Sequence, residues 1–161
     1  VPAPETRDPG SPNARYLDPI YHVCNRLRLR VRRSLEVGEI PIVLGGDHSI
    51  AIGTVSGVAE HYRSRGQKVG LIWVDAHADM NTPESSPSGN IHGMPLATVL
   101  GMGHPLLVEM GGFAPKVQPA NVCLIGIRDI DEHERQIVRN SGIHAYTMRD
   151  VDERGMRAIL E

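Results

Sequence analysis

A short polar stretch follows an apolar run near the middle of the chain, and its residue types favour a metal site. In WVDAHADMN, residues 73–81, Asp75, His77 and Asp79 stand at every second position with only alanines between them. Side chains two positions apart in an extended chain point to the same face, so these three groups are expected to converge beyond the end of a strand. Carboxylate and imidazole groups are common ligands of divalent metals. The alternative is a solvated strand end whose charges only turn the chain.

A second polar motif follows an earlier apolar run. LGGDHSI, residues 44–50, places two glycines at a sharp turn and then Asp47, His48 and Ser49 at the start of a predicted helix. Asp47 and Ser49 are explained as helix N-caps. Histidine is not a favoured N-cap, so His48 has two interpretations, a ligand at the same metal site or a loop residue.

The elements that must position these motifs alternate between strands and helices. Strands are predicted at 40–44, 69–74, 121–127 and 144–147. Helices are predicted at 16–37, 49–65, 94–100, 131–140 and from about 152 onward. This alternation predicts a three-layer α/β/α domain with a parallel sheet. Ligands bind such sheets at the carboxyl ends of the strands, where the motifs GGDHS, DAHAD and RDID are expected to meet.

Composition and charge narrow the class of protein. The 161 residues, 40% of them hydrophobic, fit a single domain over 1–161, in which residues 1–15, with four prolines, form an extended segment. A net charge of −2 with scattered basic residues argues against a nucleic-acid partner, and the arginines between 26 and 33 are interpreted as a solvated helix face. Two distant cysteines indicate reduced thiols. No apolar run reaches the ~18 residues of a membrane span, so a soluble cytoplasmic protein is expected.

The polar loop TPESSPSGNIHGMPL, residues 82–96, is by composition only a turn-rich connector. Joined to GGDHS, to DAHADMNTP and to IGIRDID at residues 125–131, it closely resembles the arginase branch of the ureohydrolase superfamily. The resemblance extends over almost the whole chain from about Pro41. It implies a manganese enzyme that hydrolyses L-arginine to L-ornithine and urea by a hydroxide bridging two manganese ions, with a place in arginine metabolism and the urea cycle. It also implies a homo-oligomer for a full-length chain.

The resemblance assigns roles to individual residues. It makes His48, Asp75, His77 and Asp79 the metal ligands, with Asp75 bridging the two ions. It makes His92 a proton-shuttling catalytic residue. It places Asn81 and Ser88 at the substrate α-carboxylate, and Asp131 and Glu134 near its α-amino group.

The chemistry of the residues agrees with these roles. A guanidinium carbon is a poor electrophile, and paired metal ions make water a strong nucleophile near neutral pH. A histidine such as His92, with a reference pKa of ~6.5, can relay a proton to the leaving amine. Asn81 and Ser88 are neutral donors that suit a carboxylate, which favours arginine over agmatine. The structural alternatives are a hydrogen-bonded loop histidine, a turn cap at Asn81, a loop position at Ser88, and an N-cap at Asp131 with Glu134 three positions on.

The chain departs from the family pattern in one respect. Family members carry a further D-x-D motif on a later strand and a later acid that faces the guanidinium, and this chain ends before both. The domain is therefore expected to be incomplete at its C-terminal side, with weakened metal binding. Three functions stay open: an arginase, an agmatinase-like guanidino hydrolase, and a truncated metal-binding chain without catalytic activity.

Overall fold

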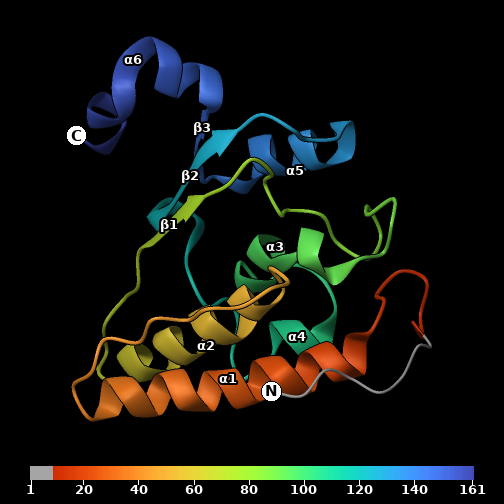
Figure 1. Cartoon of the computed structure of the whole chain (residues 1–161), viewed down its shortest axis with the longest axis vertical. Helices are drawn as coiled ribbons and strands as arrows, with labels where there is room; N and C mark the ends of the chain where they lie inside the picture. Colours follow the sequence, from red (N-terminus) through yellow and green to blue (C-terminus); the bar gives the residue numbers. More distant parts are fainter. Residues whose placement is uncertain (1–8) are drawn as a thin grey trace.

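The computed structural model describes residues 9–161, which form a parallel sheet flanked by helices (Figure 1). The sheet contains β1 (Leu71–Val74), β2 (Val122–Ile127) and β3 (His144–Thr147) in the order β1-β2-β3, and both pairs are parallel. Leu71 lies opposite Val122 in the register. The α/β prediction and the three later strands are thus confirmed.

The predicted strand at 40–44 is wrong. This segment runs extended before α2 but pairs with no strand of residues 9–161. Ile40, Ile42 and Leu44 are 90%, 85% and 91% exposed. An apolar run has the propensity for a strand, but a strand forms only where a neighbour satisfies its backbone hydrogen bonds.

Helices occupy most of the remaining chain. The last helix starts before the predicted Asp152, because Thr147 caps it and exchanges hydrogen bonds with Asp150. That helix is interrupted at Gly155, whose φ is 77°. A four-residue helix after His104 was not predicted, since one turn leaves no periodic pattern. The helices are α1 Leu17–Glu36, α2 Ile50–Arg63, α3 Pro95–Val99, α4 Pro105–Val108, α5 Glu132–Ser141 and α6 Met148–Leu160.

Helices α1 and α2 lie side by side at one end of the molecule, and α6 lies at the other end (Figure 1). Two glycines of α2 allow the close approach. A Cβ at Gly53 would lie 2.4 Å from the carbonyl oxygen of Cys24, a contact that no side chain tolerates. Glu60 of α2 also forms ion pairs with Arg28 and Arg32 of α1, so the arginine-rich face of α1 is partly tied to α2.

The main core lies between the sheet, α2 and α3 and contains Trp73, Met80, Leu96 and Leu124. This core fixes the loop that follows β1, because Met80 is fully buried in it. Ile72 and Val74, on the other face of β1, are 62% and 69% exposed, so that side of the sheet is only partly covered.

Residues 1–8 of the predicted N-terminal extended segment lie outside the described residues. Within the described part of that segment, Arg15 pairs with Asn90, and its N–H donates to the carbonyl oxygen of Gly89 at 2.9 Å. Both cysteines are free. Among residues 9–161, no helix combines the length and apolar character needed to cross a bilayer.

Candidate metal centre

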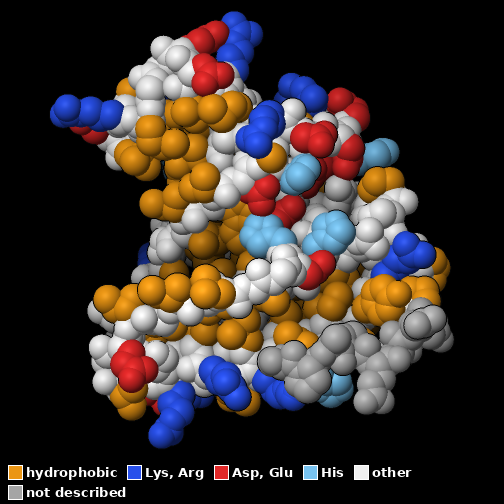
Figure 2. Space-filling view, in the orientation of Figure 1, with side chains coloured by type: hydrophobic (Ala, Val, Ile, Leu, Met, Phe, Trp, Pro, Cys, Tyr) orange, Lys and Arg blue, Asp and Glu red, His pale blue; other side chains and the backbone are white. Residues whose placement is uncertain are grey.

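Three side chains from two distant segments meet at the carboxyl end of β1. Nδ1 of His48 lies 3.1 Å from Oδ2 of Asp75 and 2.7 Å from Oδ2 of Asp79. Each of the three residues offers one ligand atom, and these atoms lie within 4.8 Å of one another. Figure 2 shows histidine and acidic side chains gathered in a hollow on this face of the molecule. The structure thus brings together three of the four predicted metal ligands.

The two aspartates converge through a turn in the chain. Strand β1 ends at Val74, and an Asp75 carboxylate oxygen accepts the backbone N–H of His77 at 3.0 Å. Asp79 has a φ of 53°, in the left-handed region, which aspartate tolerates better than most residues. The expectation that alternation along an extended chain aligns all three side chains is therefore wrong, because this segment is a loop.

His77 lies beside this group and does not complete it. Its side chain is 58% exposed, with Nδ1 3.5 Å from an oxygen of Asp75 and Nε2 3.4 Å from Oδ2 of Asp129. The contact with Asp129 was not predicted. The only sequence signal for it is the RDID motif, which was assigned to the substrate side through Asp131.

The buried carboxylate of Asp79 indicates that these residues fit a metal ion. Asp79 is 5% exposed, and burial raises its pKa to about 6 despite the nearby His48, with Asp75 adding to the rise. Oδ2 of Asp79 is buried and accepts no well-directed hydrogen bond from the described part of the chain. A bound cation would neutralise this oxygen, and two carboxylates with an imidazole suit manganese, iron, cobalt or zinc.

Neighbouring residues orient the histidines of the site. The ring of His48 lies against Trp73, with centroids 4.7 Å apart. Asp47 accepts the backbone N–H of Ser49 at 3.0 Å, and its Oδ2 lies 3.4 Å from Nδ1 of His92. Burial alone would raise the pKa of Asp47, but the hydrogen bonds from Ser49 and the adjacent His92 hold it below its usual value.

The turn before α2 differs from the prediction at Ser49 and contains an unpredicted contact between Asp47 and His92. Ser49 stands at the N-cap position of α2, but its hydroxyl donates to the carboxylate of Asp47 and does not cap the helix. The pairing of Asp47 with His92 was missed, because Asp47 has an ordinary local role in the turn. Nothing in the spacing of GGDHS and the later loop indicates that the two would meet.

Three of the predicted substrate-side residues form one network beside the metal centre. Nδ2 of Asn81 donates to Asp131 at 2.8 Å, and Asp131 accepts the N–H of Glu134 at 2.8 Å as the N-cap of α5. Glu134 accepts the backbone N–H of Met80 at 2.8 Å. The structural alternative for Asp131 is thus present, and the network ties the start of α5 to the loop after β1.

Ser88 lies in an exposed turn of the polar loop, and its hydroxyl accepts the backbone N–H of Asn90 at 3.2 Å. The hydroxyl of Ser85, in the same loop, donates to Oδ1 of Asn81 at 2.8 Å. The structure therefore connects the loop to the network through Ser85, which was not predicted to take part.

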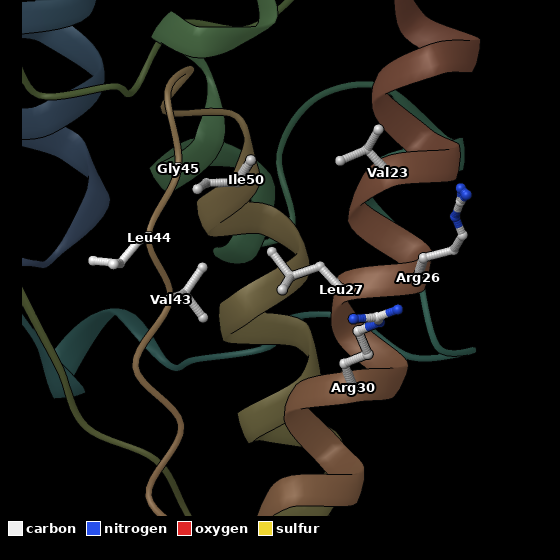
Figure 3. A pocket seen from close by; sticks show the side chains of 8 residues that line it. All are labelled: Val23, Arg26, Leu27, Arg30, Val43, Leu44, Gly45 and Ile50. Atoms are coloured by element: carbon white, nitrogen blue, oxygen red, sulfur yellow. The ribbon is translucent and has the colours of Figure 1, made fainter. Parts of the chain in front are cut away.

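A separate cavity of about 620 Å³ lies between α1 and the extended segment at 40–44 (Figure 3). Its walls are mostly apolar, with Leu27 of α1 pointing toward Val43 and Ile50 of α2 lying beside Gly45. Its lining residues include no histidine, cysteine or carboxylate that could hold a metal ion.

Known proteins resemble this chain over nearly its whole length. The family model described as "Arginase family" matches residues 5–161. This chain belongs to the arginase family. The arginase of Bacillus caldovelox is 48% identical over 159 residues, which are 99% of this chain and 52% of that protein. The arginase of Bacillus subtilis is 52% identical over 136 residues, which are 84% of this chain and 45% of that protein.

Solved arginase structures confirm the fold. The native structure of the B. caldovelox arginase superposes with a TM-score of 0.91 at 48% identity, over 99% of this chain and 52% of its own. The Entamoeba histolytica arginase, solved in complex with L-ornithine, superposes with a TM-score of 0.88 at 38% identity, over 99% of this chain and 53% of its own. This arginase-family chain thus spans about half the length of the relatives it matches.

Proposed function

We propose that this chain carries the metal-binding part of an arginase, which hydrolyses L-arginine to L-ornithine and urea. The observation that supports the proposal is the convergence of His48, Asp75 and Asp79, from GGDHS and DAHAD, at one point. Manganese would supply a water molecule activated for attack on the guanidinium carbon. His77, next to Asp75, is proposed as the fourth ligand, which requires its exposed ring to turn toward a bound ion.

The remaining residues would bind the substrate and move a proton. The side chain of His92 is 54% exposed, and its Nδ1 faces Asp47. Its imidazole could therefore deliver a proton to the leaving amine while Asp47 orients the ring. Asp131 and Glu134 provide carboxylates that suit an α-amino group, and Asn81 and Ser88 provide neutral donors that suit an α-carboxylate. The L-ornithine bound to the E. histolytica enzyme has both groups, which supports arginine over agmatine as the substrate.

Urea release from L-arginine and from agmatine, with added Mn²⁺, tests this function. The assay uses this chain and a chain extended to the length of its relatives. L-arginine is expected to be the preferred substrate, and His48→Ala is expected to abolish turnover. His22→Ala, which changes an exposed histidine of α1, is the matched control. Preference for agmatine would transfer the proposal to the agmatinase-like branch.

A second candidate, a chain that binds metal without turnover, is favoured by the position of His77 outside the group of three ligands. Equilibrium dialysis against Mn²⁺ separates the two candidates. Two tightly bound ions per chain would support the arginase, and weak binding without urea release would support the second candidate. The free thiols Cys24 and Cys123 support a reducing, cytoplasmic location for either.

A further inference from the structure

The first turn of α5 reaches the loop that carries a metal ligand. Glu134 is only 5% exposed, although it is a carboxylate near the start of a surface helix. Its Oε1 accepts the backbone N–H of Met80 at 2.8 Å, within the protein interior. Met80 is fully buried, so its N–H has no access to water and depends on this acceptor.

This hydrogen bond fixes one specific peptide unit. The N–H of Met80 belongs to the same peptide plane as the carbonyl of Asp79, and that carbonyl accepts the N–H groups of Leu96 at 3.0 Å and Ala97 at 3.1 Å. The plane is therefore held at its oxygen by α3 and at its nitrogen by Glu134. Rotation of the plane would change ψ of Asp79, a residue whose φ of 53° is left-handed and whose Oδ2 lies 2.7 Å from Nδ1 of His48.

We propose that Glu134 is a positioning residue for the metal centre, because it holds the Asp79–Met80 peptide in the orientation that aims Asp79 at the bound ion. This role rests on the proposed metal function and is separate from contact with the substrate. It needs an acceptor oxygen at a fixed distance. Glutamine supplies that oxygen, whereas aspartate keeps the charge but is one methylene too short.

Three substitutions at one position and one control test the inference. The Mn²⁺ dissociation constants of the wild-type chain, Glu134→Gln, Glu134→Asp and Glu134→Ala are measured by calorimetry. Glu134→Gln is expected to bind within about 3-fold of wild type, and the other two about 10- to 100-fold more weakly, the range typical of groups that orient metal ligands. Glu132→Ala changes an exposed carboxylate in the same helical turn and is expected to leave binding unchanged.

Hydrogen exchange of the Met80 amide, followed by NMR in the metal-free chain, gives a second measurement. The amide is expected to be protected in the wild type and Glu134→Gln and to exchange faster in Glu134→Asp. Should Glu134→Ala fail to fold, the Gln and Asp variants decide the outcome. Wild-type Mn²⁺ affinity in Glu134→Asp, or equal weakening in Glu134→Gln and Glu134→Asp, overturns the inference. If the wild type binds no Mn²⁺, the proposed metal centre fails, and the Met80 amide still decides whether Glu134 fixes the loop.

Discussion

Nδ1 of His48 and Oδ2 of Asp79 lie 2.7 Å apart, although the two residues come from loops before α2 and after β1. The aspartate is buried and the histidine is 44% exposed, so the pair forms the wall of a site that opens to solvent on one side. Without a cation, this arrangement confines the negative charge of Asp79 near that of Asp75. The buried carboxylate of Asp79 is therefore expected to lower the stability of the metal-free chain.

The first prediction follows from that cost. Asp79→Asn removes the buried charge, so in chelator-treated protein near neutral pH it is expected to raise the free energy of unfolding by about 1–3 kcal/mol. The same variant is expected to lose Mn²⁺ binding. Urea denaturation and calorimetry measure the two effects, with Asp152→Asn, at an exposed position of α6, as the control. A metal-free Asp79→Asn chain less stable than wild type would contradict the prediction.

The second prediction concerns pH. Because burial raises the pKa of Asp79 from 3.8 to about 6, its contribution to the stability of the metal-free chain is complete below about pH 4 and is lost as pH rises through about 6. Metal binding requires the ionised carboxylate and so has the opposite dependence. Below about pH 6, Mn²⁺ affinity is expected to fall roughly tenfold per pH unit, because the Asp79 carboxylate becomes protonated. Calorimetry in buffers of different ionisation enthalpy should detect proton release on binding, and equal affinity at about pH 5 and about pH 7.5 would exclude the effect.

The sequence predicts the sheet well where a strand has neighbours within the chain. The run at 121–127 became β2, which is paired on both sides. The run at 40–44 carries the same apolar signal and pairs with nothing among residues 9–161. Propensity is a property of the segment, whereas pairing depends on a partner elsewhere, so the pattern alone could not separate the two cases.

The candidate site shows the same division between residue type and geometry. The residue types in DAHAD predicted carboxylates gathered at the end of β1, where the structure places Asp75 and Asp79. The left-handed backbone at Asp79 could not be foreseen from alternation. That turn brings Asp79 to His48 and leaves His77 outside the group. The contact between Asp47 and His92 depends on how two loops pack, which no local pattern encodes.

A third prediction uses the unpaired segment. Ile42 is 85% exposed, so Ile42→Ser is expected to change the free energy of unfolding of this chain by less than about 0.5 kcal/mol. Leu124→Ala, at a fully buried position of β2, is expected to lower it by about 2–5 kcal/mol. Urea denaturation measures both, and a loss above about 2 kcal/mol in Ile42→Ser would show that the segment is packed in solution.

A fourth prediction addresses the substrate. If Asn81 and Ser88 bind the α-carboxylate, alanine at either position should raise the KM for L-arginine by roughly tenfold or more, the loss expected for a hydrogen bond to a charged group. The KM for agmatine, which has no carboxylate, should stay within about twofold. Urea release from the chain extended to the length of its relatives measures both, with Asn140→Ala on α5 as the control. Equal losses for the two substrates would indicate that these residues only maintain the loop.

The last prediction concerns the packing of α1 against α2, which supports the loop that carries His48. A methyl group at Gly53 would meet the carbonyl oxygen of Cys24 at 2.4 Å, and backbone cannot move aside as a flexible side chain can. Gly53→Ala is therefore expected to lower the free energy of unfolding by about 1–3 kcal/mol. Gly46→Ala, where an added methyl meets no atom within 4 Å, is the matched control and should stay near wild type. Since α2 begins next to His48, separation of the two helices in Gly53→Ala should also weaken Mn²⁺ binding, which calorimetry measures. Unchanged Mn²⁺ affinity in this variant would show that helix packing and metal binding are independent.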